Sequence, residues 1–524
     1  MRQPFREPAE LAAMVPDGAT VAVAGSGGGL IEPDAVLEAI ERRFLETGHP
    51  RDLTVVHALG IGARGERGMN RFAHEGMVRR VIGGHWTWSP AMQALAREER
   101  IEAYTLPGGS IMLLMREIGA GRPGLFTHVG LGTFADPRHG GGAANERARA
   151  AGPLTEVVTI EGRELLRYRP FPVDVGIVRG SDADDIGNVS TAREAADIDV
   201  KGVALAAHNG RMAGGRGGVV LAQVQRRVPR GSIPARAVTL PGILIDAVML
   251  APDQMQTHQH AFDPGLAGLV REAHEPGPSE PLPTGLRAIV ASRAADEIAA
   301  GASVNFGFGM PGGIPPVLRR RGLLDEIWIT VEQGMHNGDL LDGDLFGASR
   351  HPDAMTSSLD QFDFYSGGGL DVACLGMAEA DAAGNVNVSR LGPNVGGPGG
   401  FVDITQNAKK VVFCGFFEAK GLKAAAHDGG LRIDAPGAVR KFVGEVAEIS
   451  FSGEVARRQG QEVVYVTERA VFRLGARGLV LTELAKGLDL RRDVLERMDF
   501  RPDVAEPVAV MDARHFTAAG GATP

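Results

Sequence analysis

Glu332 is the residue of this sequence whose type and setting most need a chemical explanation. It comes after the strand-like apolar run from Ile327 to Val331, and Gly334 lies two residues later. An ionised carboxylate is costly to bury unless it is paired or has a function. The segment alone favours a structural role, in which the glutamate caps a helix or pairs with a cation. A functional role stays open, because ligands of open α/β folds gather at the carboxyl ends of strands.

Glycine runs come after several apolar segments and mark places where backbone can turn tightly or approach a ligand. Glycine makes up 73 of the 524 residues, about twice its usual share of roughly 7%. Glycine-rich loops occur in residues 24–40, 305–318, 362–376 and 391–410. The first is not a dinucleotide fingerprint, since the place of the third glycine holds Leu30, and the chain has no Walker A loop. Tight turns and anion binding at helix N-termini are the two remaining interpretations.

Several functional classes are excluded by composition. The net charge of −9 argues against a nucleic-acid-binding surface. Cys374 and Cys414 lie in apolar runs and are expected to be buried thiols of a reducing compartment. The sequence has no zinc spacing, no HExxH and no GxSxG motif, so we predict no metal site. His85 and His336 either line a pocket or serve the structure. Without a signal core or an apolar run of transmembrane length, a cytoplasmic protein with no membrane partner is expected.

Strand-like runs alternate with helical patterns along the chain. The strand-like runs are residues 20–25, 53–60, 173–180, 218–224, 303–309, 327–332, 370–376 and 410–417. Helical patterns include residues 33–48 and 89–101. Near-continuous apolar strands that alternate with helices predict an α/β fold with largely parallel sheets.

The two halves of the chain repeat each other. GATVAV from Gly18 matches GASVNF from Gly301, an offset of 283. VDVGIVRGSDADDIGNVS then matches LDVACLGMAEADAAGNVNVS, which pairs Asp174 with Asp371 at an offset of 197. The matching blocks occur in the same order while the offset falls, so the first half carries an insertion. The insertion includes part of the stretch from VIGGHW to TLPGGS and residues beyond that stretch. Such a repeat predicts two related domains.

The Pro, Gly and Glu content of residues 262–285 is typical of a linker. We therefore place the boundary near residue 276, which predicts domains at 1–275 and 276–524.

Six blocks in this order together resemble the family I coenzyme A transferases. They are AHEGMVRRVIGGHW, VGLGTFADPR, FDFYSGGGLDVACLG, EADAAGNVNVS, GGFVDITQNAKKVVFCGFF and LTELAKGLDL. The resemblance runs from PDGATVAVAG to ERMDFRP and is nearest to the single-chain acetate/propionate or 3-oxoacid CoA-transferases. It implies two open α/β domains of related architecture, with the acyl-pocket side in 1–275 and the catalytic glutamate in 276–524.

The resemblance implies that Glu332, in Val331-Glu332-Gln333-Gly334, is the nucleophile. A carboxylate with an ordinary pKa of about 4.3 is ionised at pH 7 and needs no general base. Attack on an acyl-CoA, whose thiol leaves easily, would give an acyl-glutamyl anhydride and then a glutamyl-CoA thioester, from which a second acid takes the CoA. The route is ping-pong and needs no cofactor beyond the CoA substrate.

The resemblance also implies the partners and the other site residues. Acyl-CoA and carboxylic acids are the substrates, short-chain fatty acid and ketone-body metabolism is the setting, and a homodimer or homotetramer is the expected assembly. A backbone N–H of Gly399 or Gly400 is the expected oxyanion donor. The expected CoA-binding residues are Gly307, Phe308, Gly309, Met310, Pro311, Lys420 and Lys423. The expected acyl-pocket loop holds Gly25, Ser26, Gly27 and Gly28, and no metal is implied.

This loop is richer in glycine than is usual in the family, so we expect extra room in the acyl pocket, which leaves larger or oxo-acids open as substrates.

Two other functions are alternatives. An acyl-CoA hydrolase would use the same glutamyl-CoA intermediate with water as acceptor. A ligand-sensing protein would keep the fold without catalysis, which the presence of Glu332 and all the glycine runs argues against.

Overall fold

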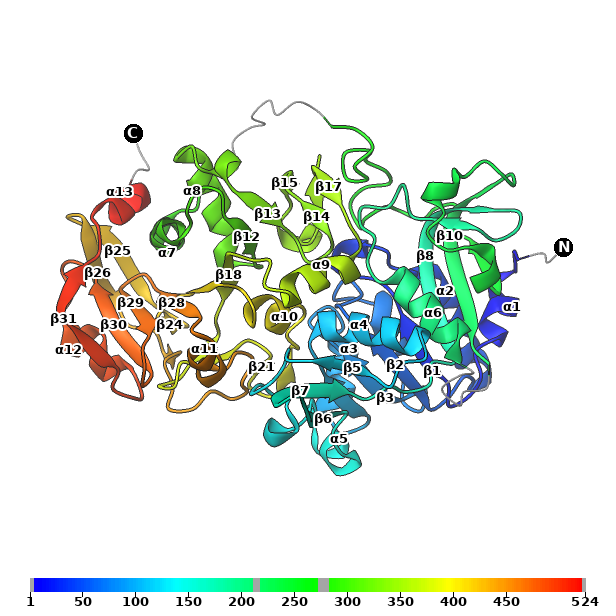
Figure 1. Ribbon diagram of the computed structural model, residues 1–524, viewed down its shortest axis with the longest axis horizontal. Coiled ribbons are helices and arrows are strands. Elements are labelled where there is room, and N and C mark those ends of the chain that lie inside the picture. The colour runs from blue at the N-terminus through cyan, green and yellow to red at the C-terminus, as the bar shows by residue number, and fades with distance from the viewer. Residues whose placement is uncertain (1–3, 211–216, 272–281, 521–524) are drawn as a thin grey trace. The chain divides into compact units, whose positions relative to one another are not determined.

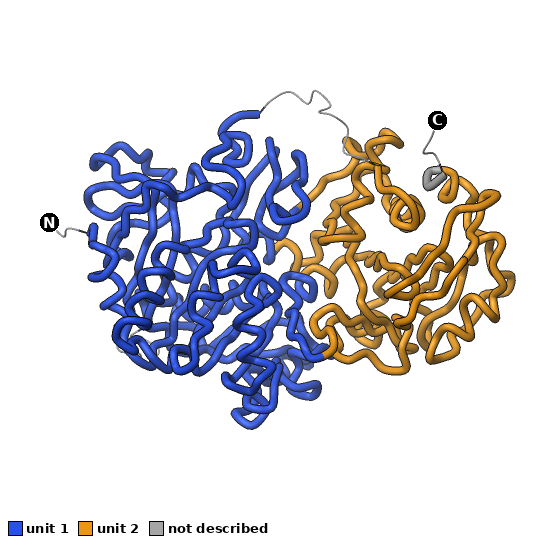
Figure 2. Tube along the Cα trace, turned by 180° about the vertical axis from the view of Figure 1, so that it is seen from behind, with its two compact units in different colours: residues 1–272, 331–363, 393–403 blue, residues 273–330, 364–392, 404–524 orange. Residues whose placement is uncertain are grey.

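The structure is a computed structural model that describes residues 4–210, 217–271 and 282–520. Its residues gather in two compact units (Figure 2). The first unit comprises Met1–Glu272 together with Val331–Asp363 and Pro393–Asp403. The second comprises Ala273–Thr330, Phe364–Gly392 and Ile404–Pro524. The boundary predicted near residue 276 lies outside the described residues, so the domain limits stay a prediction.

A parallel sheet forms the centre of the first unit, with strand order β11-β10-β8-β1-β2-β3-β4 (Figure 1). The strands are β1 (Thr20–Val23), β2 (Leu53–His57), β3 (Val78–Gly83), β4 (Glu102–Thr105), β8 (Val175–Asp184), β10 (Val219–Val228) and β11 (Ala247–Leu250), and short β9 (Val189–Ser190) pairs with β8. Strands β2 and β8 are buried along their whole length. Burial on both faces explains their near-continuous apolar sequences.

Helices cover both faces of this sheet. The helices of the unit are α1 (Pro8–Ala13), α2 (Asp34–Thr47), α3 (Pro90–Arg97), α4 (Gly108–Gly119), α5 (Glu146–Ala151) and α6 (Val200–His208). Side chains of α1, α2 and α3 share one core cluster with Val175 and Ile177 of β8. Gly176, between those valine and isoleucine positions, faces Ala207 of α6 instead. Because neighbouring residues of a strand point to opposite faces, α6 lies on the other side of the sheet from α1–α3.

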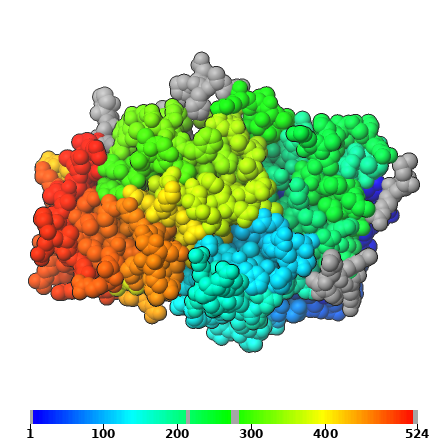
Figure 3. Space-filling model, in the orientation of Figure 1, coloured from blue at the N-terminus to red at the C-terminus, as the bar shows by residue number. Residues whose placement is uncertain are grey.

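The insertion of the first half builds extra structure between β2 and β8. It adds β3, α3, β4 and α4, and then a separate three-stranded antiparallel sheet of β5 (Leu125–Thr127), β7 (Arg163–Tyr168) and β6 (Thr155–Ile160). Side chains of this small sheet and of α5 form part of the surface of the first unit (Figure 3, cyan to teal).

The second unit has a sheet of its own, in the order β13-β12-β18-β23-β28-β29-β30-β31. Its strands are β12 (Ser303–Phe306), β13 (Trp328–Thr330), β18 (Val372–Gly376), β23 (Lys410–Cys414), β28 (Glu462–Val466), β29 (Ala470–Leu474), β30 (Leu479–Leu484) and β31 (Asp503–Val510). The first five strands in this order are parallel, and β29 pairs antiparallel with both β28 and β30. The unit also contains helices α7 (Gly285–Ala294), α8 (Ile314–Arg320), α11 (Gly453–Gln459), α12 (Leu490–Asp493) and α13 (Arg514–Gly520). Its shorter strands are the hairpin of β25 (Lys423–His427) and β26 (Gly430–Ala435), together with β19 (Glu379–Ala380), β20 (Val386–Asn387), β21 (Arg390–Leu391), β24 (Glu418–Ala419) and β27 (Val439–Arg440).

The sequence repeat is visible in individual hydrogen bonds. Asp174 accepts a bond from the Thr20 N–H at 2.8 Å, and Asp371 accepts one from the Ser303 N–H at 2.9 Å. In each copy the aspartate lies just before the central strand that pairs with the first strand. The two open α/β sheets are thus related copies, and the fold is the α/β class that the sequence predicts.

The strand that leads to Glu332 is shorter than its apolar run indicates. Strand β13 ends at Thr330, and the Gly334 N–H closes a turn on the Val331 carbonyl at 2.9 Å. Gly334 has φ +100°, which side chains rarely adopt. Residues 331–334 are therefore a turn and not the last residues of a strand.

Within the described residues, no helix is long and apolar enough to cross a membrane. The same part of the chain holds no group of three or more His, Cys, Asp or Glu side chains placed to bind a metal ion. Cys374 and Cys414 are both buried, and burial raises the pKa of the Cys414 thiol to about 12.

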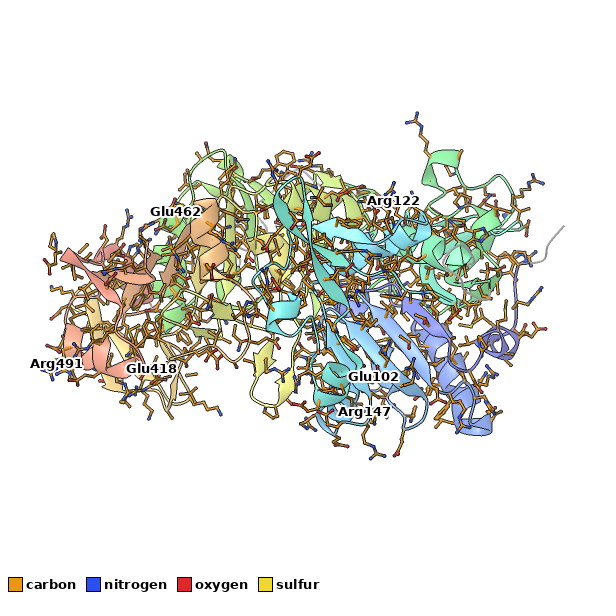
Figure 4. The ribbon with its side chains drawn as sticks, turned by 60° about the horizontal axis from the view of Figure 1, so that its bottom comes forward. Glu102, Arg122, Arg147, Glu418, Glu462 and Arg491 are labelled. Carbon is orange, nitrogen blue, oxygen red and sulfur yellow. The ribbon has the colours of Figure 1, made fainter. Side chains whose placement is uncertain are left out.

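The second unit contains a buried charge cluster around Glu418 (Figure 4). Glu418 is fully buried, pairs with Arg469 at 3.3 Å and receives a hydrogen bond from Arg497 at 2.6 Å. Arg469 is itself buried and also pairs with Glu468 at 2.7 Å. Glu418, Glu468 and Arg469 are enclosed where solvent cannot replace their partners, while Arg497 is 28% exposed.

We predict that Glu418→Ala lowers the free energy of unfolding by about 3–5 kcal/mol, because Arg497 and the buried Gly437 N–H lose their carboxylate partner and Arg469 keeps only Glu468 of its two. The matched control is Glu462→Ala, which removes a carboxylate that pairs with Lys410 and Arg473 but is 49% exposed (Figure 4). That loss should stay within about 1 kcal/mol. Urea denaturation of both variants measures the difference, and equal losses would contradict the prediction.

Candidate active site

Glu332 lies in the turn after β13, in the part of the chain that belongs to the first unit. Its carboxylate receives hydrogen bonds from the Gln333 side chain, whose Nε2 is 3.2 Å from Oε1, and from the Gly400 backbone N–H. Surrounding protein removes water from the carboxylate and raises the pKa of Glu332 to about 7, although the two hydrogen bonds oppose this shift. The sequence-based expectation of an ordinary pKa is therefore wrong, because the sequence alone does not show how closely protein surrounds the carboxylate.

The Gly399–Gly400 peptide has a defined orientation. The Gly399 carbonyl accepts a hydrogen bond from the Gly108 N–H at 2.7 Å, and the Gly399 N–H donates to the Gly84 carbonyl at 2.8 Å. In a trans peptide the carbonyl and the following N–H point in opposite directions. The Gly400 N–H consequently points away from Gly108 and reaches Glu332. Of the two glycines left open by the sequence, Gly400 has the N–H directed at the carboxylate.

Both glycines are required by their surroundings, for different reasons. Gly399 has φ +55°, a left-handed conformation that disfavours side chains, while space next to it is available. At Gly400 a Cβ atom would collide with Oε2 of Glu332. Gly400 is thus the point of closest backbone approach to the carboxylate.

The glycine loop after β1 also approaches Glu332 within the first unit. The Ser26 hydroxyl is 3.5 Å from Nε2 of Gln333, which in turn bonds Glu332. A Cβ on Gly27 would lie 2.8 Å from the Trp88 indole, and one on Gly28 would lie 2.5 Å from the Asp344 carbonyl.

The expected extra room beside this loop is therefore not found. Protein atoms fill the space that the missing side chains leave at Gly27 and Gly28. A Cβ on Gly25 would likewise lie 3.3 Å from the Ile61 side chain. The glycines allow other segments to pack closely and do not open a cavity.

His85 and Trp88 connect the two glycine loops. Both side chains lie against Gly60, where a Cβ would be 2.6 Å from Nδ1 of His85 and would collide with Trp88. His85 also faces Gly399, with Cδ2 at 3.9 Å from the would-be Cβ. Burial lowers the pKa of His85 to about 4, so its imidazole is neutral at pH 7. The guanidinium of Arg64 lies 4.7 Å above the Trp88 ring.

Asp403 is a second buried carboxyl close to Glu332. It accepts hydrogen bonds from the Gly109 N–H at 3.1 Å and from the Ser110 hydroxyl at 3.0 Å. Burial, with a smaller contribution from the neighbouring Glu332, raises the pKa of Asp403 to about 7 although these two bonds oppose the shift. Sequence reasoning did not single out Asp403, Gln333 or Trp88. An acidic residue three positions after the Gly-Gly pair is the one signal that could have indicated Asp403.

The residues predicted to bind CoA belong to the second unit. The loop from Gly307 to Pro311 comes after β12, and its Gly307 N–H bonds the Cys374 carbonyl at the end of β18 at 2.8 Å. Phe308 is 51% exposed, and both Lys420 and Lys423 are exposed. Lys441, which the sequence did not suggest, donates to the Met377 carbonyl just beyond β18 at 2.6 Å. The first-unit predictions therefore come together around Glu332, and the residues predicted to bind CoA all belong to the second unit.

Known proteins are similar in sequence to nearly the whole of this chain. The family model described as coenzyme A transferase matches residues 5–251. The acetate CoA-transferase YdiF of Escherichia coli K12 is 38% identical over 519 residues, which covers 98% of this chain and 95% of that protein. The caffeate CoA-transferase of Acetobacterium woodii is 40% identical over 517 residues, covering 97% and 96%.

Solved structures agree with this likeness. The apoenzyme of the acyl-CoA transferase YdiF from Escherichia coli O157:H7 superposes with a TM-score of 0.92 at 36% identity, covering 100% of this chain and 98% of that one. A thioester complex of the same enzyme with CoA gives 0.90 over the same shares of the two chains.

The raised pKa of Glu332 predicts a stability effect that depends on pH. Ionisation is disfavoured in the folded state, so the cost is absent below the unfolded pKa near 4.5 and complete above about pH 7. Glu332→Gln should therefore raise the free energy of unfolding at pH 8 by up to about 3 kcal/mol. Near pH 4.5 the gain should nearly vanish. Urea denaturation at the two pH values tests this, and a gain that is the same at both would contradict it.

Proposed function

This chain belongs to the coenzyme A transferase family, and we propose that it moves CoA from an acyl-CoA to a carboxylic acid through a covalent bond to Glu332. The protein is a CoA-transferase; the proposal concerns the route and the residues. The observation that carries it is a partly buried glutamate with a raised pKa, held against the Gly400 N–H.

The route consists of four attacks that balance in atoms and charge. The Glu332 carboxylate attacks the thioester carbonyl, forms an acyl-glutamyl anhydride and releases CoA thiolate. The thiolate attacks the glutamyl carbonyl, which forms glutamyl-CoA and releases the first acid as its carboxylate. A second carboxylate attacks this thioester to form a new anhydride and CoA thiolate. The thiolate then attacks the acyl carbonyl, which frees Glu332 and releases the new acyl-CoA.

The environment of Glu332 suits the first attack. A carboxylate of pKa about 7 is more basic than an ordinary glutamate, and basic oxygens are better nucleophiles within a class. The side chain is partly buried, so part of its solvent shell is already missing when the thioester approaches. About half of the protein carries the reactive ion at pH 7, which makes the first step faster at pH 8.

The Gly400 N–H supports the later attacks. Each attack on the glutamyl carbonyl places negative charge on its oxygen, and the N–H that bonds the free carboxylate is directed at that oxygen. A fixed donor of this kind contributes about 3 kcal/mol of barrier lowering. We propose Gly400 as the oxyanion donor, with the Gln333 amide beside the other oxygen.

For CoA we propose the loop Gly307–Pro311, in which Phe308 is 51% exposed, and the exposed lysines Lys420 and Lys423 of the second unit. The lysines supply positive charge for phosphate groups, and open space beside Gly309 lets a ligand approach the backbone. Binding of the remote end of CoA can lower the barrier at the thioester.

For the acid we propose a short-chain carboxylate. The relatives are named for acetate and for caffeate, which differ greatly in size. Here Trp88 and the Asp344 backbone occupy the space beside Gly27 and Gly28, which favours the smaller acyl group. Hydrolysis is the other candidate, since water could attack the same glutamyl-CoA.

One experiment tests the covalent route. Incubation with acetyl-CoA alone should leave CoA attached to the Glu332 peptide, detected by mass spectrometry, and added acetate or propionate should discharge it. Glu332→Ala should show neither adduct nor transfer. Full transfer by that variant would rule out the route, and an adduct that only water discharges would identify a hydrolase.

The role of Gly400 is tested by two alanine variants. Gly400→Ala should lower kcat at least 100-fold, because the Cβ collides with Glu332 and displaces the donor. Gly399→Ala meets open space and bears only the strain of its left-handed backbone, so it should lose far less activity. Initial rates with saturating acetyl-CoA measure both, and equal losses would argue against Gly400 as the donor.

A further inference from the structure

Asp403 lies directly behind the segment that presents the Gly400 N–H. It comes three residues after Gly400, ends the first-unit stretch Pro393–Asp403 and is fully buried. Both of its carboxylate oxygens are used, Oδ2 by the Gly109 N–H and Oδ1 by the Ser110 hydroxyl. A buried carboxyl with two donors is held firmly and is costly to displace.

The two ends of residues 399–403 are fastened to the same place. The Gly399 carbonyl is bound by the N–H of Gly108 and the Asp403 carboxylate by the N–H of Gly109, both in the first turn of α4. Helix α4 runs over Gly108–Gly119, and the N–H groups of its first turn have no partner within the helix. An oxygen that accepts a hydrogen bond from these N–H groups therefore fits well at this end of the helix.

The ring of Phe362 packs against both parts of this arrangement. A Cβ on Gly109 would collide with the ring and lie 2.8 Å from Cγ of Asp403. A Cβ on Gly400 would lie 3.0 Å from the other end of the same ring. The space between α4 and the Gly400 peptide is therefore filled, and a shift of Asp403 would be transmitted to Gly400.

We propose that Asp403 is a positioning residue of the transfer reaction, which fastens residues 399–403 to the first turn of α4 and so keeps the Gly400 N–H directed at Glu332. The inference rests on the proposed function, because it assigns Asp403 a part in the step that Gly400 supports. Asp403 itself bonds α4 and not the reacting atoms, and it neither gives nor takes a proton.

The ionisable groups that face Asp403 are Glu332 and Tyr168. A role in proton transfer would make the carboxyl group itself essential. A role in positioning requires only the two hydrogen bonds. An asparagine can accept the Gly109 N–H through its carbonyl oxygen and donate to the Ser110 oxygen, so the amide separates the two roles.

The test compares Asp403→Ala, Asp403→Asn and Ser110→Ala with the wild-type chain. The measured quantities are kcat, KM for acetyl-CoA, the melting temperature and the rate at which glutamyl-CoA appears. Asp403→Ala should lower kcat and the rate of glutamyl-CoA formation about 100-fold, the loss typical of a misplaced oxyanion donor, with KM within about threefold. Asp403→Asn should restore most of the lost kcat, and its kcat should rise with pH over the same range as that of the wild-type chain.

Ser110→Ala removes one of the two anchors and leaves the carboxyl group in place. It should lower kcat several-fold with KM unchanged, and it provides the test if Asp403→Ala does not fold.

Three results would overturn the proposal: wild-type kcat in folded Asp403→Ala or in Ser110→Ala; an Asp403→Asn variant as inactive as Asp403→Ala; or activity losses that only track the melting temperature. Failure of the proposed function is distinguishable, because it would appear as transfer without Glu332, whereas Asp403→Ala still forms glutamyl-CoA slowly.

Discussion

The hydrogen bond from the Gly108 N–H to the Gly399 carbonyl decides where the next N–H points, and the reactive site depends on that direction. A peptide is planar, so fixing its carbonyl at one side fixes its N–H at the other. The donor belongs to the first turn of α4, which is itself held by packing against α6 through Gly119 and Leu205. In the proposed route α4 therefore contributes to the chemistry, because its first turn holds the Gly399 carbonyl. Without that helix the Gly399 carbonyl would lose this donor, and the hydrogen bond from the Gly399 N–H to the Gly84 carbonyl would remain.

In the proposed route, the partial burial of Glu332 serves reactivity at the expense of stability. The same protein atoms that exclude water from the carboxylate raise its pKa, which makes the ion both rarer and more reactive at neutral pH. Gln333 and Gly400 reduce that cost without removing it, since each supplies a hydrogen bond but no positive charge. A cation beside Glu332 would stabilise the free carboxylate and weaken it as a nucleophile. The neutral His85, whose pKa burial lowers to about 4, adds no such charge to the neighbouring glycine loops.

The sequence predicted those features that are written in local patterns. The apolar runs placed β1, β2, β8, β10, β12, β18 and β23, and the repeat predicted the equivalent aspartates Asp174 and Asp371. It could not predict Asp403 or Trp88, because their importance comes from contacts with segments far away in the chain. Nor could it choose between Gly399 and Gly400, since that choice depends on a peptide orientation set by α4. The pKa of Glu332 was misjudged for the same reason: desolvation is a property of the packed structure.

The repeat also shows which residue of the first copy corresponds to Glu332. In the first copy Thr20 pairs with Thr54, and in the second copy the equivalent Ser303 pairs with Trp328. Ala58 lies four residues after Thr54, and Glu332 lies four residues after Trp328, so the two positions are equivalent. Ala58 is buried, and its carbonyl lies so close to Gly84 that only a glycine fits there. The Gly84 carbonyl in turn accepts a hydrogen bond from the Gly399 N–H. Ala58, the first-copy equivalent of Glu332, therefore packs against a residue that holds the loop whose N–H bonds Glu332. A second carboxylate at Ala58 would be buried, and an ionised carboxylate is costly to bury, which is a physical reason for the two copies to have diverged at this position.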